Sequence, residues 1–273
     1  MPPNTTAPYN DPVRKLSENL KHIEQRIAQA CARCGRSASS VTLVAVTKYA
    51  SLDLIRTLVD LGVQNLGENR GPELARRAAM VKEWLSRKAL GSESTPGPIP
   101  LWHMVGHVQR NKVKALLPWV DVIHSLDSLR LAEELDLEAG KLNRRTPVLL
   151  EVNATGEGQK HGIAFAAGSH LAEQVQSLKN LELRGLMAMG PLTEDKSAIA
   201  HTFNRVRELY EEIISLRICG PSFRDLSMGM SSDFELAIEA GATMVRIGSA
   251  LFQGIDLGPP PDPVEEESLG HGR

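Results

Sequence analysis

The sequence predicts a (β/α)8 barrel, an α/β fold, with one additional helix at its N-terminal side. Two observations lead to this fold class: short apolar runs recur along the 273 residues, and the segments between them carry helical periodicity. A chain of this length holds one large barrel or two ordinary domains. The structural alternative is a doubly wound open sheet. No Gly-x-Gly-x-x-Gly follows the first strand, which counts against its dinucleotide-binding form.

The first expected element is an amphipathic helix at residues 12–33, which ends near Gly35, a residue suited to a helix C-cap. Eight strands follow, separated by helical stretches such as "LDLIRTLVDLG" and "DFELAIEAG". The apolar face of the helix carries Val13, Leu16, Leu20, Ile23 and Ile27. The expected strands lie at 41–47, 65–68, 101–106, 121–125, 148–153, 183–189, 225–229 and 244–248.

These elements form one expected domain, residues 10–256. The stretch "GSESTPGPIP" (91–100) reads as a loop insertion rather than a domain boundary. Residues 1–9 and the acidic, Pro-rich residues 257–273 are expected to be disordered tails.

The charge balance excludes some partners. With 31 basic and 33 acidic residues, the chain offers no electrostatic case for nucleic acid or an acidic membrane surface. No apolar run approaches the roughly 20 residues of a membrane-spanning helix, and the first residues do not resemble a signal peptide. We therefore expect a soluble cytoplasmic protein that is a monomer or a weak dimer.

Cysteine and histidine spacings give little support for a metal. Three cysteines are too few and too sparse for a disulfide framework. Cys31 and Cys34 form a C-x-x-C at a helix end, without a second ligand pair nearby. His103 and His107 have metal-like spacing, but Gly106 between them makes a common helical face unfavourable. We expect no metal site.

Chemistry is expected where the strands end, because barrel enzymes carry their functional residues in the loops that follow. The first strand, "LVAVT", is followed directly by Lys48. A lysine at the mouth of an apolar barrel can serve as a Schiff-base amine. The alternative is a lysine that extends its ammonium into solvent, which is common at strand ends.

The loops after the last two strands favour a phosphate. "GMSSDF" supplies Ser231 and Ser232, and "GSALF" places Gly248 and Ser249 at the start of an expected short final helix. Free backbone N–H groups, hydroxyls and a helix N-terminus together bind phosphate, and barrels commonly bind it at these two loops. The alternative is that the serines merely cap a helix.

A lysine opposite a phosphate site suggests pyridoxal phosphate (PLP), although a sugar-phosphate aldolase with a Schiff-base lysine would use similar parts. Arg246 favours PLP because it precedes Gly248 by two residues and so points to the same side of the strand, where it could reach the cofactor's ring nitrogen. The alternative for Arg246 is a salt bridge to Asp225 or Asp233.

Seven segments then resemble, in order, the signatures of the pyridoxal phosphate homeostasis protein family. They are "LVAVTK", "NLGENR", "WHMVGHVQRNK", "HSLDS", "LLEVN…GE…KHG", "LRGLMAM" and "LSMGMSSDFELAIEAGATMVRIGSALFQG". The resemblance runs from about residue 12 to residue 254. It implies a barrel similar to the N-terminal domain of alanine racemase, PLP as cofactor, and a role in balancing free PLP without an established reaction. PLP-dependent apo-enzymes are the implied recipients.

The resemblance also assigns roles to residues. Lys48 matches the Schiff-base lysine, Arg246 the residue facing the pyridine nitrogen, and Asn69 and His103 fall in motifs that line the pocket. The residues that match the phosphate cup are Ser227, Ser231, Gly248 and Ser249.

Two departures from the family pattern matter. Ala50 stands where many relatives have a second lysine, so a PLP hand-off that uses this lysine is in doubt. The insertion before Trp102 is also unusual.

Two other functions compete with PLP homeostasis: an amino-acid racemase that uses PLP, and a Schiff-base aldolase that does not. Racemisation needs acid–base groups on both faces of the cofactor. In racemases one of them is a tyrosine from a separate C-terminal β domain. Tyr9, Tyr49 and Tyr210 all precede the end of the expected barrel, so we expect no turnover.

Overall fold

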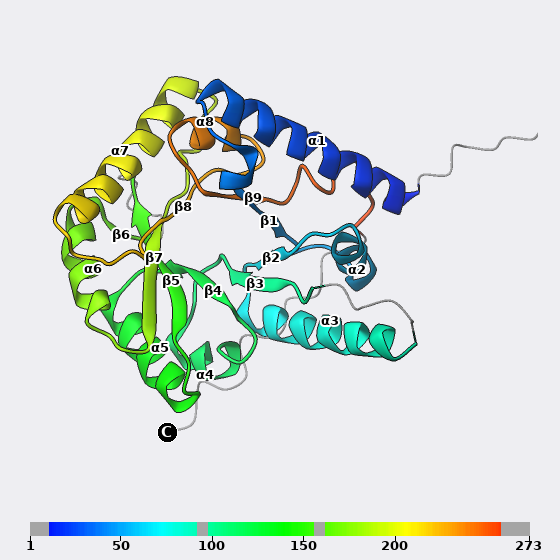
Figure 1. Ribbon diagram of the computed structural model, residues 1–273, viewed down its shortest axis with the longest axis horizontal. Helices are drawn as coiled ribbons and strands as arrows, with labels where there is room; N and C mark the ends of the chain where they lie inside the picture. Colours follow the sequence, from blue (N-terminus) through cyan, green and yellow to red (C-terminus); the bar gives the residue numbers. More distant parts are fainter. Residues whose placement is uncertain (1–10, 92–97, 156–161, 258–273) are drawn as a thin grey trace, which may run out of the picture.

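Parallel strands close into a barrel in the computed structural model, which describes residues 11–91, 98–155 and 162–257 (Figure 1). Around the barrel, β1 to β5 are followed by β7, β8 and β9, and β9 pairs with β1. The pairing of β4 with β5 closes the sheet, which confirms the barrel and excludes the open-sheet alternative. The strands are β1 (Thr42–Val46), β2 (Asn65–Glu68), β3 (Leu101–Met104), β4 (Val122–Leu126), β5 (Thr146–Asn153), β6 (Ile163–Ala164), β7 (Leu181–Met187), β8 (Asp225–Ser227) and β9 (Met244–Ile247).

Helices surround the strands, because each parallel connection must return along the outside of the barrel (Figure 1). They are α1 (Pro12–Arg33), α2 (Leu52–Asp60), α3 (Gly71–Gly91), α4 (Val113–Leu116), α5 (Leu129–Lys141), α6 (Gly168–Gln176), α7 (Lys196–Ser215) and α8 (Phe234–Glu239).

Helix α1 has the limits that its sequence predicts. Asp11 accepts a hydrogen bond from the Val13 amide at its start. At its end Gly35 has a φ of +68°, and the amide of Arg36 bonds to the Cys31 carbonyl, the pattern of a glycine C-cap. The predicted apolar face is buried except for Val13, which is exposed.

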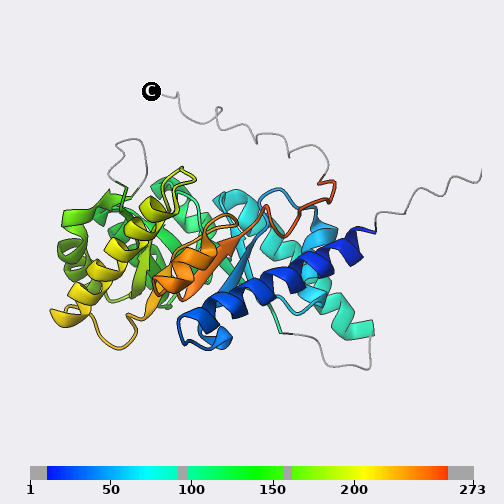
Figure 2. The ribbon, with the colours of Figure 1, turned by 90° about the horizontal axis from the view of Figure 1, so that it is seen from above.

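Helix α1 packs against α8, so that the first and last helices lie side by side in both views (Figures 1 and 2). Arg26 pairs with Glu235 at 2.6 Å, and Arg33 pairs with Glu239 at 2.6 Å. Asn19 of α1 also donates to the Leu251 carbonyl, 2.8 Å away, beyond β9. The additional helix therefore holds the segment that ends the barrel.

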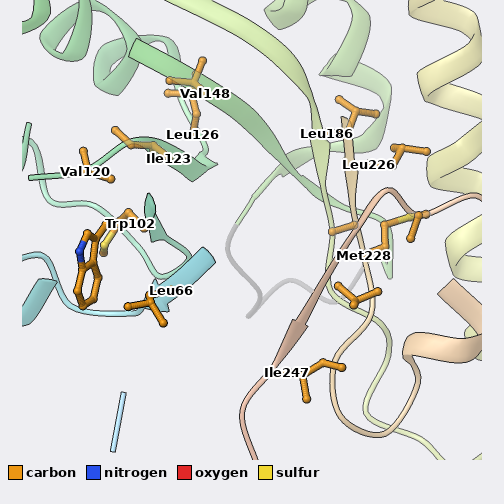
Figure 3. Close-up of a cluster of buried hydrophobic side chains, with 14 of the residues drawn as sticks. Leu66, Trp102, Val120, Ile123, Leu126, Val148, Leu186, Leu226, Met228 and Ile247 are labelled. Carbon is orange, nitrogen blue, oxygen red and sulfur yellow. The ribbon is translucent and has the colours of Figure 1, made fainter. Parts of the chain in front are cut away.

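Side chains alternate along each strand between the helices and the barrel interior. The outward side chains form the main core with the helices, as Figure 3 shows for Leu66, Trp102 and Ile247 from β2, β3 and β9. The inward positions are less uniform. Leu149, Met187 and Met244 form a small separate apolar cluster. Polar side chains that alternate with the core positions fill other inward places: His103, His124, Glu151, Ser227 and Arg246.

Two details differ from the sequence-based expectations. The short strand β6 was not expected; it pairs with β5 beside the barrel. Residues 249–254 form turns rather than a final helix, although the Leu251 amide still bonds to the Gly248 carbonyl. The predicted tails lie outside the described residues, except for residue 257. So do residues 92–97 of the predicted insertion. None of the described helices combines the length and apolar character that crossing a bilayer requires.

Candidate functional site

Lys48 leaves the barrel directly after β1, on a backbone that is held from two sides. The Thr47 hydroxyl donates to Glu68 at 2.6 Å, and the Thr47 carbonyl accepts from Arg77. Lys48 itself is half-buried, and its ammonium lies 4.9 Å from the ring centre of Tyr49. Among the described residues no carboxylate pairs with this ammonium. The amine therefore lies at the barrel mouth without an ionic partner from the part of the chain that the structure describes.

The support beneath Lys48 is a buried ion pair between β2 and α3. Arg77 Nη1 lies 2.6 Å from Glu68 Oε1, and its Nε lies 3.1 Å from Glu73. Burial raises the pKa of Glu68, and the neighbouring Arg77 guanidinium opposes that rise only in part. Because Arg77 also binds the Thr47 carbonyl, α3 fixes the point at which β1 ends.

The loops after β8 and β9 meet at the same rim. The Ser231 hydroxyl accepts a hydrogen bond from the Ala250 amide, 3.2 Å away, and so ties the two loops together. Ser231 and Gly248 are partly accessible and Ser249 is exposed. Three of the four predicted phosphate-cup residues therefore come together.

Neither predicted serine caps helix α8. The helix begins after Asp233, whose carboxylate accepts from the Met230 amide at 2.6 Å, and Ser232 is exposed. The hydroxyl of Ser231 faces the β9 loop instead, through its bond to Ala250. The capping alternative is therefore not the one that the structure adopts.

Arg246 lies inside the barrel, one layer below this rim, and is 5% exposed. Its Nη1 donates to the carbonyl and the hydroxyl of Ser227, both 2.7 Å away, and its Nη2 donates to the Ala188 carbonyl at 3.0 Å. Within the described ranges it forms no salt bridge, and Asp225 pairs with Arg184 at 2.8 Å instead. Burial lowers the pKa of Arg246 to about 10, although Glu151 and Asp233 oppose this change.

Ser227 and His103 occupy places that the sequence did not predict. Ser227 is fully buried, and its hydroxyl bonds to Arg246 and to His124 Nδ1, 2.9 Å away. His103 is 1% exposed; its Nδ1 lies 2.8 Å from His124 Nε2, and its Nε2 lies 3.0 Å from Asn65 Oδ1. We refer to Asn65, His103, His124, Ser227 and Arg246 as the interior chain.

Asn69 lies at the end of β2, half-buried and close to the loop after β3. A Cβ atom on Gly106 would lie 2.3 Å from the Asn69 carbonyl oxygen. Only glycine therefore permits the two loops to approach this closely. This contact holds the Asn69 backbone at the rim, where the sequence places it.

Glu151, which was not predicted, adds a carboxyl group to the interior side of β5. It is 3% exposed, and the charged groups that influence it are Asp127, Arg246 and His107. His107 and Asp127 pair with each other at 3.0 Å. Burial, followed by the Asp127 charge, raises the pKa of Glu151 to about 7, against the opposing effects of Arg246 and His107.

The two motifs with metal-like spacing do not assemble a ligand set in the described part of the chain. His103 belongs to the interior chain, whereas His107 is exposed and bonds to Asp127. Cys31 is buried in α1, and Cys34 is exposed with its sulfur against the Ala30 carbonyl. No group of three or more His, Cys, Asp or Glu side chains is arranged for a metal among these residues.

Comparison with known proteins shows the structural class of the chain and then its family. The family described as "Alanine racemase, N-terminal domain" matches residues 18–255, so the chain is a barrel of this class. A pyridoxal phosphate homeostasis protein of Aquifex aeolicus (strain VF5) is 38% identical over 86% of this chain and 96% of its own length. The chain belongs to the pyridoxal phosphate homeostasis protein family.

Solved structures agree with this assignment. An unknown protein from Bifidobacterium adolescentis superposes with a TM-score of 0.81 and 35% identity, over 88% of this chain and 95% of its own. PipY of Synechococcus elongatus PCC7942, solved with PLP bound, has a TM-score of 0.73 and 30% identity, over 87% of this chain and 99% of its own.

Proposed function

We propose that this protein binds PLP at the mouth of its barrel, holds it as a Schiff base on Lys48, and maintains PLP balance without catalytic turnover. The observation that carries the proposal is the meeting of Ser231, Gly248 and Ser249 at the rim formed by β8 and β9, because β9 pairs directly with β1, the strand that precedes Lys48. The PLP bound to PipY and the names of the relatives support the same ligand.

The residues present fit this cofactor. Lys48 has no carboxylate partner within the described ranges, so no ion pair there stabilises its charged form against reaction with an aldehyde. Gly248 has no side chain where a phosphate would approach, and a Cβ atom there would lie 3.2 Å from the Val46 carbonyl. Arg246 uses Nη1 and Nη2 inside the barrel, while its Nε donates to no described group.

When bound, PLP supplies an aldehyde for amines and a ring that withdraws electrons. The chain's own residues hold it. The backbone amides and hydroxyls of Ser231 and Ser249 would bind its phosphate, and Arg246 would face its ring nitrogen. Because guanidinium only donates hydrogen bonds, Arg246 favours an unprotonated ring, which withdraws electrons less strongly. This arginine alone does not decide between holding and catalysis; the proposal of no turnover rests on the second acid–base group that racemisation needs.

The test is an absorbance spectrum of the purified protein, followed by borohydride reduction and mass spectrometry. We expect a yellow protein with its adduct on Lys48, and Lys48→Ala should lose both while folding normally. Ser231→Ala or Ser249→Ala should each weaken PLP retention about ten- to a hundred-fold, since a hydrogen bond to a charged group contributes roughly 1.5–3 kcal/mol. The variant that combines the two substitutions should retain PLP more weakly still.

Specific outcomes would contradict this proposal. A colourless protein that still reduces onto Lys48 with a sugar-phosphate substrate would favour the aldolase alternative. An adduct on Lys112 or Lys160 would remove Lys48 from its role. Unchanged PLP binding in the double serine variant would place the phosphate elsewhere.

A further inference from the structure

The direction of every hydrogen bond in the interior chain follows from Arg246. A guanidinium has only donors, so the Ser227 hydroxyl oxygen must accept from Arg246 Nη1. The hydroxyl hydrogen of this fully buried serine has one remaining described partner, His124 Nδ1, at 2.9 Å. His124 Nδ1 therefore accepts, and the imidazole carries its proton on Nε2.

The same reasoning extends to the other end. His124 Nε2–H donates to His103 Nδ1, 2.8 Å away, so His103 carries its own proton on Nε2. That N–H then donates to Asn65 Oδ1 at 3.0 Å. All donors and acceptors along the chain are matched with both imidazoles neutral, and each residue fixes the hydrogen position of the next.

The electrostatics agree with neutral imidazoles. Burial, with a contribution from Arg184, lowers the pKa of His103 to about 3. Burial lowers the pKa of His124 well below its usual range, and the neighbouring His103, Arg246 and Arg184 lower it further. Neither histidine takes up a proton near neutral pH, so the order of donors does not reverse there.

The polar residues of the interior chain are not required only to fill the space inside the barrel. Leu149, Met187 and Met244 fill other inward positions of the same interior, so apolar side chains fit this space. The polar residues instead form one connected path, and it ends on Arg246.

We propose that His124 is a positioning residue: through Ser227 it orients the Arg246 guanidinium toward the candidate site, and His103 and Asn65 keep His124 in the required tautomer. The part that concerns PLP rests on the proposed function, whereas the orientation of Arg246 is a property of the protein without ligand.

Two substitutions at His124 separate its hydrogen bond to Ser227 from its hydrogen bond to His103. Asparagine places an oxygen near the position of Nδ1 and keeps the Ser227 bond. Glutamine reaches the position of Nε2 and keeps only the His103 bond.

The first measurement uses protein stripped of PLP and nitrogen-15 NMR of the imidazole and arginine groups. We expect both histidines to be Nε2–H tautomers, neutral from about pH 5 to pH 8. The Arg246 Nε–H resonance should keep its position in His124→Asn and should shift or broaden in His124→Gln. An Nδ1–H tautomer at His124, or an Arg246 resonance that is the same in both variants, would overturn the proposal.

The second measurement is PLP dissociation, followed by the change in absorbance. His124→Gln should release PLP about tenfold faster than wild type, and His124→Asn less than about threefold faster, as expected when one charged hydrogen bond loses its alignment. Equal rates in the two variants would contradict the positioning role. A wild-type protein that binds no PLP would instead contradict the proposed function, and the NMR comparison would still decide the role of His124.

If His124→Gln does not fold, the same comparison is made at His103. There asparagine keeps the bond to His124 and glutamine keeps the bond to Asn65. His103→Gln should then disturb Arg246 more than His103→Asn does, and the opposite order would overturn the proposal.

Discussion

At the scale of single residues, the position of a side chain was predicted best where it depends on one strand alone. Lys48 follows a buried strand, and Arg246 and Gly248 share one side of β9, as a two-residue repeat predicts. Ser227 shares that inward direction, but its partners come from β4 and β9. The two-residue repeat predicts whether a side chain points into the barrel or toward the helices. It does not give the residue that faces it across the barrel, because that depends on the registers of several strands.

The surroundings of Glu151 across the barrel could not be predicted from the sequence either, and they lead to a prediction about stability and pH. Raising its pKa from 4.5 to about 7 means that the folded protein holds this proton more tightly than the unfolded chain does. Its contribution to stability is complete below about pH 4.5 and is lost as the pH rises through about 7. The corresponding free energy is on the order of 3 kcal/mol.

Glu151→Gln should therefore stabilise the protein at pH 8.5 relative to wild type and have little effect at pH 4.5. Thermal unfolding at both pH values measures this difference. Glu208→Gln, at an exposed glutamate of α7, is the matched control and should show no such dependence. Equal stability of Glu151→Gln and wild type at the higher pH would mean that Glu151 is ionised without cost.

At the scale of elements, the strand centres and helix α1 could be predicted from the sequence, because apolar periodicity and caps are local signals. The connection between α3 and β1 could not be predicted. Arg77 reads as one of many helix charges, yet it is 4% exposed and bound to Glu68 and the Thr47 carbonyl. An arginine side chain is long enough to reach two strands from a neighbouring helix, and the sequence does not show which one does so.

Arg77→Met should destabilise the protein by about 3–5 kcal/mol, because it leaves Glu68 buried without its cation. Chemical denaturation measures the change in the free energy of unfolding. The control is Arg76→Met at the adjacent residue, whose side chain is 56% exposed where it pairs with Glu73, so that this pair should contribute at most about 1 kcal/mol. Adding Glu68→Gln to Arg77→Met should recover part of the loss, and a lack of recovery would argue against the buried charge as the cause.

At the scale of the whole molecule, the barrel belongs to the class named for the alanine racemase N-terminal domain, so the proposed absence of turnover must come from the groups around the site. Racemisation needs proton donors and acceptors on both faces of the cofactor. Tyr210 stacks on Phe223 with ring centres 5.1 Å apart and belongs to the outer helix α7. Tyr49 is exposed beside Lys48. Glu151 is the buried acid that could compete for the second role, since β5 lies opposite β1 in the barrel order.

We expect the PLP-loaded protein to leave L-alanine unchanged in deuterium oxide. The α-proton signal and the chirality of the recovered amino acid measure the outcome. Formation of D-alanine would favour the racemase. Loss of that activity in Glu151→Gln, with PLP still bound, would then identify Glu151 as the second base.

The bonds from Asn19 to the turn beyond β9 link the first helix that the structure describes to a segment synthesised more than two hundred residues later. Lys48 leaves the ribosome roughly two hundred residues before Ser249, at about 5–20 residues per second. For more than about ten seconds, the growing chain therefore exposes the amine without the loops proposed to hold the phosphate. The complete proposed site, and with it the proposed capacity to hold PLP, arises only once α1 binds the last turn after β9. We therefore expect a chain truncated before that turn to contain Lys48 but to retain no PLP.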